Sequence, residues 1–193
     1  MGLPEGKSPL TYKEYLELDD GIRYEVIEGQ VYNMSPAPTT KHQAVLRELL
    51  TEFTLFLRGK KCSVFASPID VCFYEDDNDL SKIEEWVEPD LVVVCDKNKI
   101  REKRIVGVPD LIVEILSPST AKKDKIIKYN RYQRAGVKEY WIVDPSNETV
   151  DVYVLEQTGF KHAGTYFKED TLPVRLFAGF EITLSNVFRD EEI

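Results

Sequence analysis

Two apolar runs near the middle of the chain constrain its fold more than any other feature. "DLVVVC" spans residues 90–95 and "DLIVEIL" spans residues 110–116, and neither run alternates polar with apolar residues. A strand without that alternation is usually buried on both faces, as in a sheet that carries helices on each side. The two runs therefore predict a mixed central sheet flanked by helices, in the α/β or α+β fold class.

Helical patterns stand on both sides of these runs. Apolar residues at helical spacing predict one helix over residues 41–57, and a second helix is expected over about residues 121–134. A short strand rich in aromatic and β-branched residues follows at 139–144. After it, two strand patterns are separated by a turn at residues 157–159 and predict a hairpin.

The N-terminal part adds a smaller unit. Thr11 and Glu14 form a capping-box pattern that predicts a short helix. Two short strand patterns around Glu28 and Gly29 predict a hairpin. We expect this helix and hairpin to extend the core, and we expect residues 1–193 to form a single domain.

The three cysteines bear on the cellular compartment. Cys62, Cys72 and Cys95 are scattered, odd in number and set in apolar stretches, without the close spacing of a zinc site. They predict reduced, buried thiols and a cytoplasmic protein. No apolar run approaches the roughly 20 residues that cross a bilayer, and residues 1–10 lack the apolar core of a signal peptide. We therefore expect no membrane partner.

Each of the two central runs contains a carboxylate. Asp90 begins the first run and Glu114 lies near the end of the second, so antiparallel pairing would make them neighbours. Adjacent carboxylates in an apolar sheet repel each other and are costly to bury, and a Mg²⁺ or Mn²⁺ ion would resolve both problems. Asp110 points to the same face as Glu114 but lies roughly 13 Å along the strand, which makes it a weaker metal ligand. Alternatively, these acids pair with Lys or Arg, or lie exposed at strand ends.

Several segments carry a resemblance to a known family. These are "YEVIEGQVYNMSPAPTTKHQ", "EPDLVVVCD", "GVPDLIVEILSPST", "DKIIKYNRYQRAGVKEYWIVDP" and "VDVYVLEQTGF". Together they resemble the Uma-type putative restriction endonucleases, a bacterial group in the PD-(D/E)XK nuclease superfamily. The resemblance extends over about residues 12–180. It implies a restriction-endonuclease-like α-β-β-β-α-β core and Mg²⁺- or Mn²⁺-dependent hydrolysis of DNA phosphodiester bonds.

The resemblance also assigns roles to residues. Asp90 and Glu114 occupy the places of the motif's metal-binding acids. The motif's lysine should stand two residues after the second acid, but that position is Leu116. The following helix offers Lys128, or else Lys123, as the replacement cation that assists the attack on the phosphate. Alternatively, both lysines are solvated.

Three further side chains are candidates for the same site. His42 begins the first long helix, which the resemblance places beside the site, and could move a proton or orient water; a surface position is the alternative. Glu25 in the hairpin and Glu48 on the helix could each add a carboxylate. Tyr129 and Tyr132 are not counted among them, because both are expected to pack within their helix, with base stacking as the alternative.

The charge distribution bears on the partner. The net charge of −9 by itself argues against nucleic-acid binding. Residues 97–138, however, hold twelve basic and four acidic residues, a net +8, which leaves −17 for the rest of the chain. Such an asymmetry can mark a surface that contacts DNA phosphates, or it can reflect solvated helix and loop faces.

Two functional hypotheses follow. The first is a metal-dependent nuclease that contacts DNA through residues 97–138 and acts as a homodimer, which would let it reach two strands. The second is a catalytically silent nuclease fold that serves oligomerisation or protein binding. Leu116 and the negative net charge favour the second hypothesis.

Overall fold

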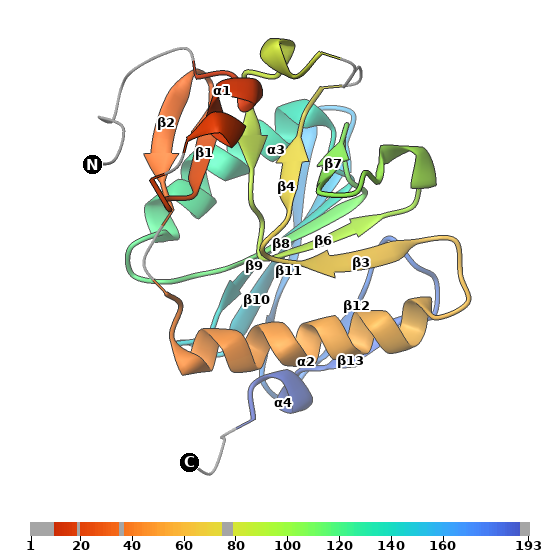
Figure 1. Ribbon diagram of the computed structural model, residues 1–193. Helices are drawn as coiled ribbons and strands as arrows, with labels where there is room; N and C mark the ends of the chain where they lie inside the picture. Colours follow the sequence, from red (N-terminus) through yellow and green to blue (C-terminus); the bar gives the residue numbers. More distant parts are fainter. Residues whose placement is uncertain (1–9, 19, 35–36, 75–78, 190–193) are drawn as a thin grey trace.

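A computed structural model describes residues 10–18, 20–34, 37–74 and 79–189 (Figure 1). The segment considered for a signal peptide lies almost entirely outside the described residues. The elements follow in the order α1 (Tyr12–Glu17), β1 (Tyr24–Ile27), β2 (Gln30–Asn33), α2 (Thr40–Leu57), β3 (Ser63–Ala66), β4 (Asp70–Cys72), η1 (Leu80–Lys82), β5 (Trp86–Val87), β6 (Leu91–Val94), η2 (Lys97–Lys99), β7 (Arg104–Val106), β8 (Leu111–Ile115), η3 (Lys123–Lys128), α3 (Tyr129–Ala135), β9 (Glu139–Asp144), β10 (Thr149–Glu156), β11 (Gly159–Phe167), β12 (Thr171–Pro173), β13 (Glu181–Thr183) and α4 (Leu184–Val187).

A six-stranded mixed sheet forms the centre of the fold. Its strand order is β11-β10-β9-β8-β6-β3, with β8 and β9 parallel and the other neighbours antiparallel. Every residue of β6 and β8 is buried, as the unbroken apolar runs predict. The two strands pair antiparallel with Leu91 opposite Val113, which confirms the expected pairing.

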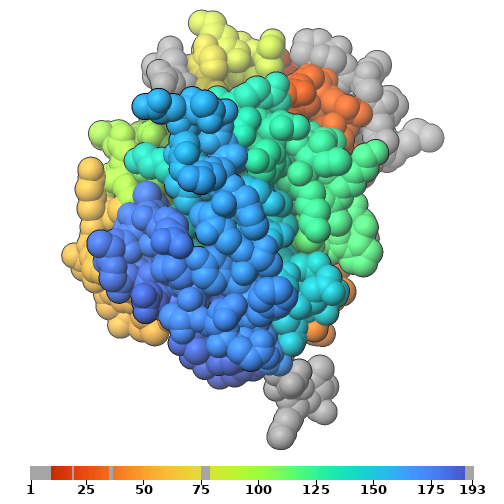
Figure 2. Space-filling view, turned by 180° about the vertical axis from the view of Figure 1, so that it is seen from behind, coloured from red at the N-terminus to blue at the C-terminus, as the bar shows by residue number. Residues whose placement is uncertain are grey.

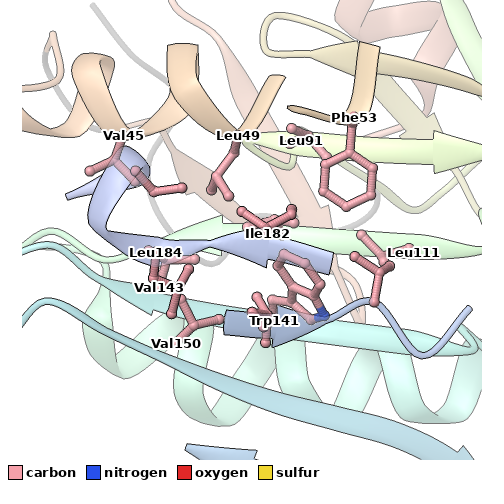
Figure 3. Close-up of a cluster of buried hydrophobic side chains, with 14 of the residues drawn as sticks. Val45, Leu49, Phe53, Leu91, Leu111, Trp141, Val143, Val150, Ile182 and Leu184 are labelled. Carbon is pink, nitrogen blue, oxygen red and sulfur yellow. The ribbon is translucent and has the colours of Figure 1, made fainter. Parts of the chain in front are cut away.

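Helix α2 covers one face of this sheet. The Thr39 side chain caps its start by accepting a hydrogen bond from the His42 backbone N–H. Figure 3 shows side chains of α2 facing the strands, with Ile182 and Leu184 between the two layers. This apolar layer fixes how α2 lies across the sheet and so brings its N-terminus to the beginning of β6. The labelled members of the cluster are Val45, Leu49, Phe53, Leu91, Leu111, Trp141, Val143, Val150, Ile182 and Leu184.

The opposite face of the central sheet packs against α3 and a second sheet. That sheet has the order β2-β1-β5-β4-β7, and its buried residues, among them Ile27, Val71 and Val87, share one apolar cluster with Tyr132 of α3 and Tyr140 of β9. The predicted capping box and the pairing of β1 with β2 are both present. The hairpin is not a separate extension, however, because β1 also pairs with β5 and so belongs to this second sheet. Seen from behind, residues after about 150, in blue, fill the middle of the molecular surface (Figure 2).

The strand-like stretch before residue 75 divides between the two sheets. A cis peptide bond joins Ser67 to Pro68 in the bend between β3 and β4. Strand β3 then pairs with β6 in the central sheet, whereas β4 pairs with β5 and β7 in the second sheet. The chain therefore connects the two sheets beside the start of β6.

The prediction of three reduced cysteines is wrong for two of them. Cys62 and Cys95 form a disulfide, while Cys72 is a buried free thiol. The cause lies in the strand register, because Ser63 stands opposite Val94 and the next residues outward are the two cysteines. Count and spacing along the chain carry no information about this pairing. Within the described residues, no helix has the length and apolar character needed to cross a membrane.

Candidate active site

A pocket of about 540 Å³ opens where the N-terminus of α2, the start of β6, the end of β8 and η3 meet. It contains five of the residues that the sequence nominates, although they come from distant parts of the chain. Apolar side chains of Met34, Pro38, Leu46 and Pro68 complete part of its wall. The nominated residues that line the pocket are His42, Asp90, Glu114, Lys123 and Lys128.

Asp90 lies at the beginning of β6 beside the end of β8. Its Oδ2 accepts a hydrogen bond of 2.7 Å from the backbone N–H of Ile115 and lies 3.4 Å from His42 Nε2. Its side chain is 21 % exposed, so it faces the open part of the pocket. The strand register places Asp90 next to Glu114, as the sequence predicts.

Glu114 is the buried partner in this pair of carboxylates. It is 3 % exposed, and its Oε1 accepts hydrogen bonds from Lys128 Nζ at 2.8 Å and from the Tyr132 hydroxyl at 2.6 Å. Burial raises the pKa of Glu114 well above its ordinary value, and the Lys128 charge only partly opposes that effect. Tyr132 thus packs within the core, as expected, and also holds the Glu114 carboxylate.

Lys128 supplies a buried cation beside Glu114. Its ammonium nitrogen lies 2.8 Å from Glu114 Oε1 and 2.6 Å from Glu25 Oε1. Burial alone would lower the pKa of Lys128, but the neighbouring Glu114 and Glu25 charges outweigh burial and raise it well above its ordinary value. Leu116, at the motif-lysine position, instead packs against the apolar cluster shared with the second sheet. The cation near Glu114 therefore comes from the following helix.

The first part of the predicted helix over residues 121–134 is a π-helix. Residues 123–128 form this segment, and α3 continues from it as an α-helix. In a π-helix each turn closes between residues i and i+5, and such segments are frequent at functional sites. Lys123 and Lys128 are five residues apart and both contact Glu25. The π-helical segment thus places two lysines on one side.

Glu25 is fully buried on β1 and contacts both lysines. Its Oε1 lies near Lys128 and accepts a 3.0 Å hydrogen bond from the Glu88 backbone N–H, and its Oε2 pairs with Lys123. Burial would raise the pKa of Glu25, but the two lysine charges hold it below its ordinary value. The N-terminal hairpin therefore contributes a carboxylate, and that carboxylate binds cations of the protein itself.

His42 is buried rather than on the surface. It is 8 % exposed and contacts Asp90 through Nε2. Burial lowers the pKa of His42, but hydrogen bonding to Asp90 and the Asp90 charge raise it above its ordinary value. Its Nδ1 is buried and has no hydrogen-bond partner among the residues that the structure describes.

Two nominated carboxylates lie away from this pocket. Asp110 accepts hydrogen bonds from Lys138 Nζ at 2.7 Å and from the Cys95 backbone N–H at 2.7 Å, and it does not line the pocket. The reason is its place at the opposite end of β8, one residue before the strand begins. Glu48 forms ion pairs with Arg47 and Arg189. Neither residue joins Asp90 and Glu114.

The pocket also contains charged residues that sequence reasoning did not nominate. Glu88 is 5 % exposed and binds Arg23 and the Ser67 hydroxyl, so it holds an arginine at the pocket wall. Its position two residues before Asp90 was the sequence feature that could have identified Glu88.

Asp124 is a second buried acid of the pocket. It is 2 % exposed, and its Oδ1 lies 4.0 Å from Lys128 Nζ. Burial raises the pKa of Asp124.

Part of the positive charge in residues 97–138 is neutralised within the protein. Five of its basic residues form ion pairs with acids, mostly from other parts of the chain, and only two of these five line the pocket. The charge asymmetry in the sequence therefore corresponds partly to internal pairing. The paired residues are Lys123, Lys128, Arg131, Arg134 and Lys138.

The donor set fits a hydrated divalent cation. Within the described parts of the chain, no group of three or more His, Cys, Asp or Glu side chains is arranged to enclose a metal ion. Magnesium usually keeps several waters and binds through one or two carboxylates. Asp90 and Glu114 offer two carboxylates to the pocket, and buried Asp124 Oδ1 accepts no hydrogen bond from the described residues. Such an open site, with two carboxylates and room for water, suits Mg²⁺ or Mn²⁺, because these ions seldom take all their ligands from the protein.

The fold and the family are established by comparison with known proteins. A crystal structure from Anabaena variabilis, described as a putative nuclease belonging to DUF820, matches with a TM-score of 0.72. The match covers 93 % of this chain and 98 % of that chain at 22 % identity, and it shows that the two share a mixed α+β fold. Residues 12–185 match the Uma2 family, described as "Putative restriction endonuclease". This chain belongs to the Uma2 family, as the resemblance in its sequence predicts.

Two Synechocystis proteins are similar along most of the chain. The uncharacterized protein slr1290 is 25 % identical over 183 residues, which cover 93 % of this chain and 92 % of the relative. The uncharacterized protein sll1609 is 26 % identical over 149 residues, which cover 75 % of this chain and 80 % of the relative. The names of these two relatives state no activity.

Proposed function

We propose that this protein is a nuclease that hydrolyses phosphodiester bonds in DNA with the help of Mg²⁺ or Mn²⁺. The observation that carries the proposal is the meeting of Asp90, Glu114 and the buried cation Lys128 in one pocket. Membership of the Uma2 family and similarity to the Anabaena putative nuclease support the nuclease class. The site chemistry supports a metal-assisted reaction.

Asp90 and Glu114 would hold the metal ion. Their carboxylates come from adjacent strands, and other backbone and side-chain contacts already fix both of them. A bound divalent cation supplies Lewis acidity that stabilises the negative charge gathering on the phosphate in the transition state. His42 orients Asp90 through its Nε2 contact and need not touch the substrate.

Lys128 replaces the motif lysine, because Leu116 stands at the motif position and carries no charge. Its ammonium group is fixed against Glu114 and keeps its proton because two carboxylates surround it. A water oxygen attacks phosphorus and gives up one proton to solvent, the bond from phosphorus to the leaving oxygen breaks, and that oxygen takes up a proton from solvent, so the net reaction consumes one water. Lys128 orients the attacking water and stabilises the charge that develops during this step.

The pocket rim supplies cations for substrate phosphates. Arg23 and Lys123 both line the pocket, and buried carboxylates, Glu88 and Glu25, hold them in place. Because several other basic residues of segment 97–138 are paired internally, only a few phosphate contacts are expected. The affinity for DNA should therefore depend only modestly on salt concentration.

The test is cleavage of plasmid DNA and of circular single-stranded DNA by the purified protein in Mg²⁺ or Mn²⁺. We expect metal-dependent cleavage that is lost in Asp90→Ala and Glu114→Ala. Absence of cleavage on both substrates, together with no metal-dependent change in melting temperature, would refute the nuclease. Full cleavage by Lys128→Ala would refute the lysine assignment alone.

Leu116 is the residue that favours a second candidate function. An apolar residue at the motif-lysine position favours a silent nuclease fold that serves oligomerisation or protein binding. Failure of both cleavage and metal binding would favour this function. The predicted homodimer bears on both functions, and light scattering of the purified protein measures it. The cytoplasmic location stays a prediction that fractionation of expressing cells can check.

A further inference from the structure

The most unusual charge arrangement in the protein is the one around Glu25. A single fully buried carboxylate on β1 accepts two lysines of one helical segment, with one lysine at each oxygen. The Glu88 backbone N–H adds a third contact, at Oε1. Both oxygens of Glu25 are thus engaged with donors of the protein, which leaves Glu25 poorly suited to bind a metal ion.

The π-helical backbone is what allows this arrangement. Five residues correspond to about 1.4 turns of an α-helix, so Lys123 and Lys128 would point in different directions in a regular α-helix. In a π-helix residues i and i+5 are one turn apart. Lys125, in the same segment, is exposed and does not line the pocket. The segment therefore separates two pocket lysines from a solvated one.

The two lysines held by Glu25 differ in their surroundings. Lys128 is 3 % exposed and also contacts Glu114, the deeper carboxylate of the site. Lys123 is 14 % exposed, contacts no second carboxylate within the described chain and lies over the Tyr32 ring at 5.9 Å. One lysine faces the reacting centre, and the other lies closer to the pocket mouth.

We propose that Glu25 is a positioning residue that directs Lys128 toward the reacting phosphate and Lys123 toward a neighbouring phosphate of the same strand. The inference rests on the proposed nuclease function. It assigns the N-terminal hairpin a part in the reaction, although the hairpin lies outside the two metal-binding strands. It also assigns the two lysines different tasks, since Lys128 acts on the rate and Lys123 acts on substrate binding.

Steady-state kinetics separates these tasks. Glu25→Gln should lower kcat about 100-fold, as expected when a reacting group moves by roughly 1 Å. Lys123→Gln should raise KM about tenfold with kcat little changed, because it removes one charge-assisted contact. Lys125→Gln is the matched control and should change neither constant. Wild-type kcat in Glu25→Gln would overturn the inference.

A measurement that needs no catalysis separates this inference from the proposed function. In protein carrying ¹³C at the lysine ε-carbons, the Lys123 and Lys128 ε-carbon resonances should both move in Glu25→Gln relative to the wild type at the same pH, because each ammonium group loses its contact with Glu25. If the wild type cleaves no DNA but these resonances move, the nuclease fails while the placement of the lysines by Glu25 stands. Unchanged Lys123 and Lys128 resonances overturn the placement.

The double variant Glu25→Gln/Lys123→Gln guards against misfolding. Glu25→Gln alone leaves a surplus of positive charge in a buried place, and removing Lys123 relieves part of it. We expect the double variant to recover melting temperature relative to Glu25→Gln without recovering kcat. Recovery of kcat together with stability would mean that Glu25 acts only on folding.

Discussion

The two ends of strand β8 carry similar groups and differ in their surroundings. At one end Asp110 pairs with Lys138, and at the other Glu114 pairs with Lys128. The Lys138 side chain is 64 % exposed, whereas the Lys128 side chain is 3 % exposed. A contact between a carboxylate and a lysine is therefore not enough to identify a reactive site.

The two ends of β8 also differ in how fully the carboxylate oxygens are hydrogen-bonded to donors of the protein. Near Asp110, the neighbouring strand contributes Glu139, which accepts hydrogen bonds from the Trp141 indole and from the backbone N–H groups of Arg175 and Leu176. Neither Asp110 nor Glu139 lines the pocket beside Glu114. Near Glu114, by contrast, carboxylates and cations share a pocket with room for a ligand. The first end stabilises the fold, and the second end is suited to chemistry.

The largest expected effect compares isosteric substitutions at the two ends. Glu114→Gln should reduce DNA cleavage by at least about 100-fold, because it removes one of the two charges proposed to bind the metal ion. Asp110→Asn should leave cleavage within about twofold of the wild type, because Asp110 does not line the pocket. Initial rates on a labelled single-stranded substrate in Mn²⁺ measure both. Equal losses in the two variants would remove the distinction between the ends.

The second comparison concerns stability. Lys128→Met leaves two buried carboxylates without their shared cation and should lower the free energy of unfolding by about 3–5 kcal/mol. Lys138→Met removes an exposed cation and should cost no more than about 1 kcal/mol. Urea unfolding followed by Trp fluorescence measures the difference. If the two costs were alike, the Glu114 end would not be electrostatically special.

The third and smallest effect is a pH dependence of stability that involves His42. Its pKa is raised in the folded protein, so its protonated form contributes stability that is present below its unfolded pKa of about 6.5. That contribution disappears as the pH rises through the folded value. His42→Gln should therefore lose more stability at pH 5.5 than at pH 8.5, as urea unfolding at each pH can show.

A matched control sharpens the His42 prediction. In Asp90→Asn the histidine loses the carboxylate that raises its pKa, so its NMR titration should move to lower pH. The ring resonances of His162, which contacts Asp151 rather than Asp90, should be the same in the variant and the wild type. A His42 titration indifferent to Asp90 would contradict the contact between them.

Pairing of the central strands was predictable because the apolar runs at β6 and β8 are long and uninterrupted. Antiparallel pairing through a single connection then places Asp90 beside Glu114 without further knowledge. The family resemblance added the role of these acids and drew attention to Leu116. These features depend on local pattern and simple topology, which the sequence expresses directly.

Other features depend on three-dimensional contacts that no local pattern encodes. The π-helical segment carries Lys123 and Lys128 to Glu25, but residues 121–134 read only as a helix. The Cys62–Cys95 disulfide follows from the β3–β6 register rather than from cysteine spacing. Residues 97–138 have the charge of a phosphate-binding surface in the sequence. In the folded protein, acidic residues from other parts of the chain pair with some of these basic residues. Pairing across long sequence separations explains each of these differences.

The most direct test of the account is calorimetric titration of Mn²⁺ into the wild type and three variants. The account predicts that the wild type and Asp110→Asn bind Mn²⁺ with similar affinity, whereas Asp90→Asn and Glu114→Gln bind it at least about tenfold more weakly, each having lost one carboxylate ligand. Equal Mn²⁺ binding by all four proteins, or none by the wild type, would contradict the assignment of the metal site to the Glu114 end of β8.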